Sequence, residues 1–212
     1  MASDGSTYHH GNLKRVLLDT ALKMIQERGD FHFTMRELAR RAEVTHNAPY
    51  RHFADKNTLL AALAEEGFTV LGKALVRRRK KEGSDPVRHL RTLAQEVVKF
   101  AIKKPFHYQL MFGNVLRGNA DKHPPLKKAS EEVFLILAGV LQACQDEGSA
   151  RTDFTAAELA VGAWSMAHGL SSLALSGHLA KKPNSAIRLS DQLADMLFEG
   201  IIKHREATLT SP

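Results

Sequence analysis

The apolar positions of this chain recur with the spacing of an α-helix, and no stretch alternates in the manner of a β-strand. In residues 11–28 the apolar side chains fall on one stripe, and Gly29 follows where a helix would end. Further helices are predicted at about residues 34–41, from Thr45 onward, and at about 55–80, 86–103, 105–118, 125–147, 155–180 and 186–204. The pattern therefore predicts an all-α protein with nine helices.

Residues that cap helix N-termini precede several of these helices. A side-chain oxygen at this position accepts a hydrogen bond from a backbone N–H that the helix leaves unpaired. The predicted caps are Thr34 with Glu37, Thr155 with Glu158, Asp55, and Asp85 followed by Pro86.

The composition narrows the class of protein. With 212 residues, 43% hydrophobic and 25% charged, the chain has enough apolar residues for one large domain or two modest ones. Its net charge of +7 favours polyanionic partners such as nucleic acid or an anionic membrane. Cys144 is the single cysteine, so no internal disulfide is possible. We find neither a signal-peptide pattern nor an apolar segment long enough to span a bilayer, and expect a cytoplasmic protein without a membrane partner.

Two short helices joined by a tight turn are predicted between residues 34 and 53, which is the arrangement of a helix-turn-helix. Short helices are marginal alone, so their caps matter more. A DNA-reading helix can be short because only its first turns enter the major groove. The alternative interpretation is an ordinary helical hairpin within a core.

The stretch FTMRELARRAEVTHNAPYRHFADKNTLLAAL, residues 33–63, resembles the DNA-binding region of the TetR family of bacterial transcriptional regulators, and KRVLLDTALKMIQERG fits the helix before it. The segment AVGAWSMAHGLSSLALSG resembles a sensor domain of one branch of that family, the Trp-His-Gly type, marked by Trp164, His168 and Gly169. The resemblance implies a DNA-binding domain at residues 1–57 and a ligand-binding and dimerisation domain at 58–212. It also implies a homodimeric regulator, and specifically a repressor, that binds a palindromic operator in double-stranded DNA. Binding of a small ligand would release this regulator from the DNA.

The same resemblance implies DNA contacts for eight residues of the motif: Thr34, Thr45, His46, Asn47, Ala48, Tyr50, His52 and Lys56. Asn and Ala suit adenine and the thymine methyl group, and the others suit phosphates or the adjoining backbone. The chain departs from the family pattern at two positions. Glu43 stands where the family usually has a glycine in the turn, which predicts a left-handed and mildly strained glutamate. The alternative is a rearranged turn in which Glu43 is right-handed. Pro49 lies inside the reading helix, which predicts an irregular start.

Aromatic and methionine side chains in the second half suit an adaptable apolar pocket. The predicted ligand-binding residues are Phe106, Tyr108, Met111, Phe112, Phe134, Trp164 and His168. The alternative for most of them is plain core. The predicted ligand is a small apolar or amphipathic molecule.

Small residues and an apolar stripe in the last two helices predict a four-helix dimer interface, as the resemblance implies. Its predicted members are Gly162, Gly169, Leu193, Leu197, Gly200 and Ile201. The alternative is that these helices close the core of a single subunit.

The rival functions are a helical enzyme that processes a small molecule, and a DNA-binding protein with no ligand. The sequence has no nucleophile elbow, P-loop, dinucleotide-binding glycine pattern or zinc-protease motif. Ser165 and His168 stand three apart on a helix without a visible third partner. The 11 histidines form no recognised metal-ligand spacing. We therefore expect no enzymatic activity, no cofactor and no metal site.

Overall fold

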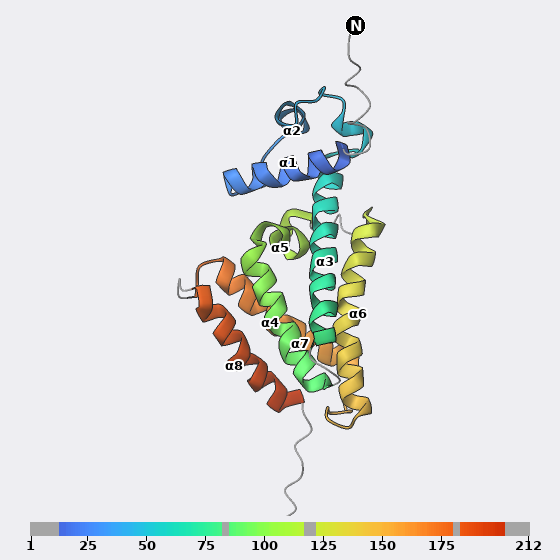
Figure 1. Cartoon of the computed structure of the whole chain (residues 1–212), viewed down its shortest axis with the longest axis vertical. Helices are drawn as coiled ribbons and strands as arrows, with labels where there is room; N and C mark the ends of the chain where they lie inside the picture. Colours follow the sequence, from blue (N-terminus) through green and yellow to red (C-terminus); the bar gives the residue numbers. More distant parts are fainter. Residues whose placement is uncertain (1–12, 82–84, 117–121, 180–182, 202–212) are drawn as a thin grey trace, which may run out of the picture. The chain divides into compact units, whose positions relative to one another are not determined.

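The structure is a computed structural model that describes residues 13–81, 85–116, 122–179 and 183–201 (Figure 1). Within these ranges all regular secondary structure is helical, which confirms the predicted all-α class. The eight α-helices there are α1 (Leu13–Arg28), α2 (Met35–Arg41), α3 (Lys56–Lys81), α4 (Pro86–Lys103), α5 (Pro105–Phe112), α6 (Pro124–Asp146), α7 (Ala156–Leu175) and α8 (Pro183–Ile201). Two short 3₁₀ helices, η1 (Pro49–Arg51) and η2 (Asn114–Leu116), complete the set.

The chain folds into two compact units that are not consecutive in sequence. The first unit comprises residues up to Phe68 together with Phe106–Ala129, and the second comprises Thr69–Pro105 together with residues from Ser130 onward. Helices α3 and α6 each contribute to both units. The units thus divide the chain elsewhere than at the predicted functional boundary between residues 57 and 58, and that boundary stays a prediction.

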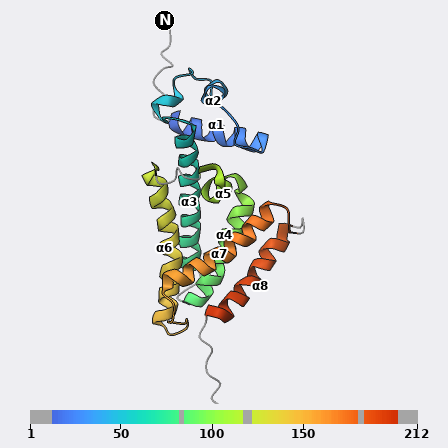
Figure 2. The same ribbon diagram turned by 180° about the vertical axis from the view of Figure 1, so that it is seen from behind.

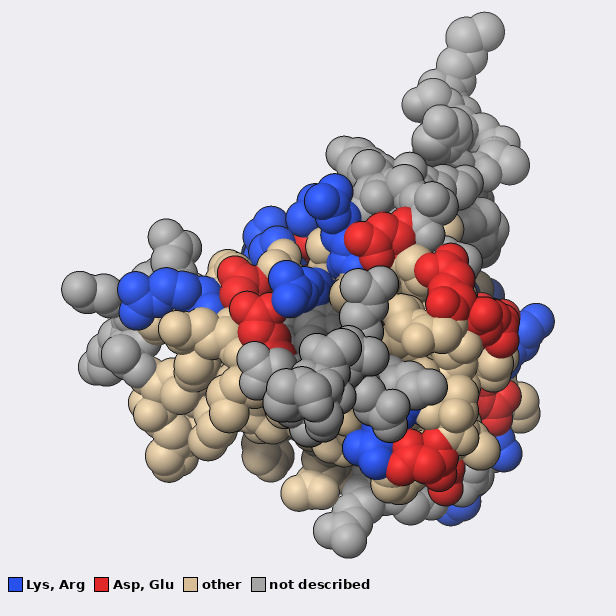
Figure 3. Space-filling view, turned by 90° about the horizontal axis from the view of Figure 1, so that it is seen from below, with Lys and Arg blue, Asp and Glu red and all other residues tan. Residues whose placement is uncertain are grey.

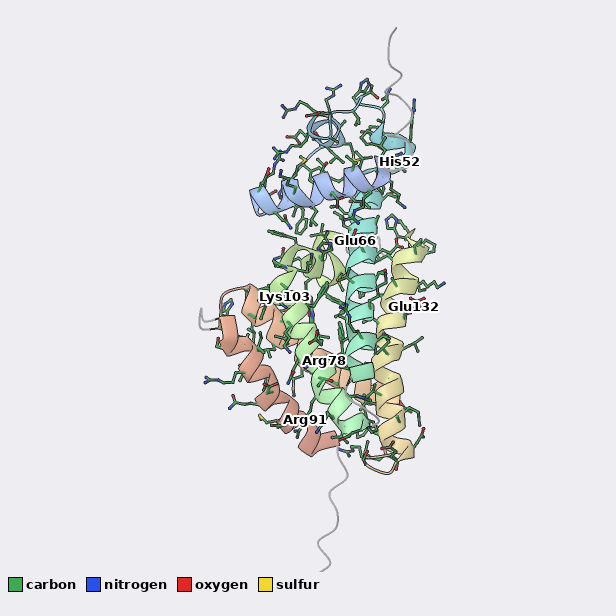
Figure 4. All side chains as sticks on the ribbon, in the orientation of Figure 1. His52, Glu66, Arg78, Arg91, Lys103 and Glu132 are labelled. Atoms are coloured by element: carbon green, nitrogen blue, oxygen red, sulfur yellow. The ribbon has the colours of Figure 1, made fainter. Side chains whose placement is uncertain are left out.

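In the first unit, α1 packs against α2. Helix α1 ends at Gly29, whose φ of 75° is reached by glycine without steric penalty. Arg15 of α1 bonds Glu66 of α3 at 2.8 Å (Figure 4), and Arg28 pairs with Glu37 of α2 at 3.2 Å. These pairs are partly exposed, so each contributes little to stability but orients the helices that it joins.

In the second unit, α4, α7 and α8 pack against one another, and the view from behind shows α7 crossing α4 (Figure 2). The buried side chains of Val98, Leu170 and Ala186 join the three helices. An exposed ion pair also links two of these helices: Arg91 of α4 bonds Asp195 of α8 at 2.9 Å. Among the described residues on the face drawn in Figure 3, acidic and basic side chains are interspersed.

The predicted caps are confirmed. Glu37 and Glu158 complete capping boxes at α2 and α7, Asp85 caps α4, and the Asp55 carboxylate accepts the Thr58 N–H at 2.7 Å at the start of α3. Hydrogen bonds from backbone N–H groups stabilise the charged carboxylates and lower the pKa values of Glu37, Glu158 and Asp55. No helix in the described part of the chain is long and apolar enough to cross a bilayer.

Candidate functional site

Helix α2 begins at a fully formed capping box. The Thr34 hydroxyl accepts the Glu37 N–H at 3.1 Å, and the Glu37 carboxylate accepts the Thr34 N–H at 2.7 Å. The box holds Thr34 at an exposed helix start. The Thr34 hydroxyl also donates its proton to the Glu37 carboxylate at 3.1 Å. A phosphate that binds this hydroxyl therefore competes with Glu37 for its single proton.

The turn after α2 contains the predicted left-handed residue. Glu43 has a φ of 56°, and it is the one non-glycine residue with positive φ in the described ranges. The neighbouring backbone closes the helix, with Ala42 N–H donating to Leu38 O at 2.9 Å and Val44 N–H to Ala39 O at 3.0 Å. The prediction that Glu43 occupies a conformation that favours glycine is therefore confirmed.

Residues 45–52 do not form the α-helix that the sequence predicts from Thr45. Residues 46–48 form turns, and η1 follows over Pro49–Arg51 as a 3₁₀ helix. The hydrogen bonds join residues three apart, as from Ala48 N–H to Thr45 O at 2.9 Å and from Arg51 N–H to Ala48 O at 3.2 Å. Pro49 has no N–H to donate to the first turn, so an α-helical ladder from Thr45 lacks one of its early bonds. In the 3₁₀ pattern, the residues on either side of Pro49 donate instead to carbonyls three positions back.

The segment nevertheless presents a polar surface. Thr45, His46, Asn47 and His52 are exposed, and Tyr50 is 52% exposed. Four polar side chains, those of Glu43, Thr45, Arg51 and His52, line a hollow of about 600 Å³ beside the start of α1. The structure thus brings most of the predicted DNA-contacting residues of this segment to the surface together.

Ala48 behaves differently from its neighbours. It is only 8% exposed, so its methyl group packs against the first unit instead of facing outward. Lys56 is half-buried, with its ammonium 4.8 Å from the centre of the Phe33 ring. Burial lowers the pKa of Lys56, although the nearby charges of Asp30 and Glu37 oppose the shift. The lysine is held at the start of α3 by this ring contact.

Sequence reasoning missed three exposed arginines of the motif. Arg36 and Arg40 stand four apart on α2, and Arg51 belongs to η1. The structure gives none of them an ion pair with another described residue, whereas the nearby Arg41 is paired with Glu27. The i, i+4 spacing of Arg36 and Arg40 was a signal for one basic helix face.

The second unit contains a small internal cavity of about 30 Å³. Its walls come from α3, α4, α6 and α7: Leu75, Leu90, Leu93, Ala94, Val97, Val133, Leu137, Ala163, Trp164 and Ala167. Of the predicted ligand-binding residues, Trp164 lines this cavity. Phe134 and His168 are half-buried on α6 and α7, and burial lowers the pKa of His168. Sequence reasoning missed most of the aliphatic walls, because their helical spacing is that of any buried stripe.

The other predicted ligand-binding residues belong to the first unit, where they form an aromatic cluster. Phe112 contacts Phe68 and Tyr108 with ring centres 5.1 and 4.8 Å apart, and Phe106 contacts Phe31 at 6.3 Å. Near them Gly67 lets α3 approach α5, since a Cβ there would lie 2.5 Å from the Met111 sulfur. These side chains pack α5 onto α3 and onto the loop after α1.

The predicted interface residues have mixed surroundings. A Cβ added at Gly162, Gly169 or Gly200 would meet no atom within 4 Å, whereas Leu193 packs against the core formed by α4, α7 and α8. The side chains of Leu197 and Ile201 lie outside the described residues. Three large apolar side chains on the same two helices are exposed: Val161 at 55%, Leu173 at 47% and Met196 at 66%.

Known protein families match both the N-terminal and the C-terminal part of the chain. Residues 17–63 match the family described as "Bacterial regulatory proteins, tetR family", and residues 90–197, half of the chain, match "Tetracyclin repressor-like, C-terminal domain". The chain belongs to the TetR family of bacterial transcriptional regulators. The match includes α2, the Glu43 turn and η1 at one end and the cavity walls of α4, α6 and α7 at the other. Assignment to the Trp-His-Gly branch stays a prediction.

Individual TetR-family proteins and solved structures agree with this assignment. The HTH-type transcriptional regulator AcrR of Shigella flexneri is 28% identical over 95 residues, which is 45% of this chain and 44% of that protein. The matched region thus spans less than half of that relative. A structure of a protein with unknown function from Rhodococcus sp. RHA1 is 31% identical, covers 93% of this chain and 100% of its own, and superposes with a TM-score of 0.81. FadR from Bacillus subtilis, solved in complex with stearoyl-CoA, shares the fold at a TM-score of 0.71, with 16% identity and coverage of 88% and 98%.

Proposed function

We propose that this TetR-family regulator is a homodimeric repressor. Each subunit reads one half of a palindromic operator with residues 1–57, and a small ligand bound within residues 58–212 releases the DNA. The observation that carries the proposal is the exposed polar surface of Thr45, His46, Asn47, Tyr50 and His52, displayed directly after the capped helix α2.

Within this surface the residues divide into two roles. Asn47 and His46 reach base edges in the major groove, because an amide can bond both edge groups of adenine. Thr34, Tyr50, His52 and Lys56 bond phosphates, which hold the segment in register without reading sequence. The exposed arginines Arg36, Arg40 and Arg51 add further phosphate contacts. Ala48 is excluded from the base-reading set by its burial.

The 3₁₀ geometry of η1 suits a short reading element. Asn47 lies in the turn before η1, and the Tyr50 N–H donates to Asn47 O at 3.2 Å, so the two residues are joined by the same three-residue spacing that η1 has. Tyr50 then reaches the phosphate strand beside the groove that Asn47 enters. Pro49 lies between them and is buried, which fixes this short segment against the first unit.

Ligand control would work through α3. This helix carries Lys56 at its start and Leu75 in a wall of the cavity, so one continuous helix joins the two functions. A ligand that favours the α3 position incompatible with DNA lowers operator affinity by the same factor as DNA lowers ligand affinity. FadR was solved with stearoyl-CoA, which supports a ligand role for this fold but does not define the ligand of this chain.

Dimerisation would use the exposed sides of α7 and α8. Val161, Leu173 and Met196 expose large apolar side chains there, and Gly162 and Gly200 leave room for a partner helix. Two helices from each subunit would form a four-helix interface related by two-fold symmetry.

Selection of bound duplexes from random-sequence DNA tests the repressor proposal. We expect the selected sites to share an inverted repeat, because a two-fold dimer presents two identical reading segments. Binding to all duplexes with equal affinity would refute sequence-specific regulation. A selected site that consists of a single half would refute the dimeric reading mode.

A further inference from the structure

The cavity of the second unit is built almost entirely from hydrocarbon. Nine of its ten lining residues are leucine, valine or alanine, and Trp164 supplies the single polar side-chain atom, its indole N–H. Among the described residues, no charged side chain lines the cavity. Glu96 lies within 3.8 Å of Arg78 and 3.5 Å of Lys99, and Arg91 pairs with Asp195; Arg78 and Arg91 are labelled in Figure 4.

We propose that the ligand of this regulator is a compact, neutral, apolar ring compound that occupies this cavity. The inference rests on the proposed ligand-responsive function. A carboxylate or phosphate transferred into these walls would lose its hydration without gaining a cation, at a cost of several kcal/mol. A neutral hydrocarbon ring loses no polar hydration and gains contacts with every wall.

The dimensions of the walls favour a ring over a long chain. On α4 the lining runs from Leu90 to Val97, which at a rise of about 1.5 Å per residue spans roughly 10 Å. On α7 it covers only Ala163 to Ala167, about one helical turn. A single ring with short substituents matches this length, whereas an extended acyl chain would also have to displace side chains beyond these walls.

The ligand must enlarge the cavity as it enters. A water molecule needs roughly 10–15 Å³ on the scale on which this cavity measures about 30 Å³. A ring therefore displaces side chains, and Trp164 is the largest movable wall. Ala94, Ala163 and Ala167 provide the complementary space, because their small side chains leave the backbones of α4 and α7 accessible.

Trp164 is also the only tryptophan of the chain, so its fluorescence reports directly on this cavity. Toluene and benzoate form a matched pair of probes that differ by a methyl group and a carboxylate. The full-length protein is titrated with each probe, with excitation at the red edge of the indole band where neither probe absorbs. We expect a saturable change in emission and a raised melting temperature with toluene, and at least about tenfold weaker binding of benzoate.

A substitution that fills the cavity tests whether the change in Trp164 emission arises from toluene bound there. Ala167→Leu occupies the space and should abolish the response to toluene, whereas Ala157→Leu on the exposed side of the same helix should leave it unchanged. If Ala167→Leu does not fold, Ala94→Leu fills the cavity from α4, where the alanine is only half-buried. Equal binding of benzoate, no response to toluene, or an undiminished response in the folded filling variant would overturn the proposal.

Operator binding separates this inference from the proposed function on which it rests. Toluene binding at Trp164 without any change in operator affinity supports the ligand class but contradicts ligand-controlled release. Release of DNA by charged compounds that leave Trp164 unaffected supports ligand control and overturns the inference about the cavity.

Discussion

Replacing Glu43 by glycine tests the physical account of the helix-turn-helix turn. Glu43 has a φ of 56°, where the Cβ of an L-residue approaches its own backbone, at a cost of roughly 1–2 kcal/mol. Glycine has no such penalty, but its freedom in the unfolded chain costs roughly 0.5–1 kcal/mol. The carboxylate of Glu43 makes no ion pair with another described residue, so little else is lost. We expect Glu43→Gly to leave stability unchanged or raise it by about 1 kcal/mol.

Urea unfolding followed by circular dichroism measures this change, and two further variants control it. Glu43→Ala keeps the Cβ and its strain, and should unfold like the wild type. Glu131→Gly places glycine at an exposed, right-handed position inside α6, and should lose about 0.5–1 kcal/mol. A loss of stability in Glu43→Gly equal to that in Glu131→Gly would refute the strained turn.

Three further predictions follow from other parts of the structure. Asn47→Ala should relax base preference by about 1–3 kcal/mol at one position of each half-site, whereas Tyr50→Phe should weaken operator and random DNA alike, as competition titrations would reveal. Gly200→Leu should convert the dimer to folded monomers in sedimentation, since a Cβ at Gly200 would meet no described atom within 4 Å and the larger side chain would occupy space that a partner helix needs; a folded variant that stays dimeric removes Gly200 from the interface. Gly139→Ala, inside α6 with open space around the new methyl group, should raise stability by about 0.5–1 kcal/mol, and a loss in urea unfolding would contradict the described exposure.

Local chemistry made much of this fold predictable from the sequence. Thr34 and Thr155 cap helices through bonds to residues three positions away, and such short-range signals do not depend on the rest of the fold. The same holds for Glu43, whose backbone is set by the turn that follows α2. Pro49 was recognised as a source of irregularity, but the sequence did not predict that the segment would form a 3₁₀ helix.

Features that depend on tertiary packing were harder to predict from the sequence. Ala48 is flanked by exposed polar residues, and its burial depends on what the rest of the first unit places beneath it. The cavity walls at Leu90, Leu93 and Val133 have the spacing of any core helix, so no local pattern distinguishes a wall from a filled core. Phe106 and Phe112 were predicted to line a pocket because they are aromatic, but in the structure they pack against Phe31 and Phe68.

In the proposed complex, two copies of this chain read DNA through their exposed segments around Asn47. Hydroxyl-radical footprinting on a selected duplex, with the protein-to-DNA stoichiometry measured in the same complex, tests this most directly. We expect two subunits per duplex and two protected patches related by two-fold symmetry. The centres of the two patches should lie about one helical turn apart, or a multiple of it. Asn47→Ala should leave the phosphate protection in place while weakening discrimination between bases. A single protected patch bound by one subunit, or uniform protection that ignores sequence, would contradict the account.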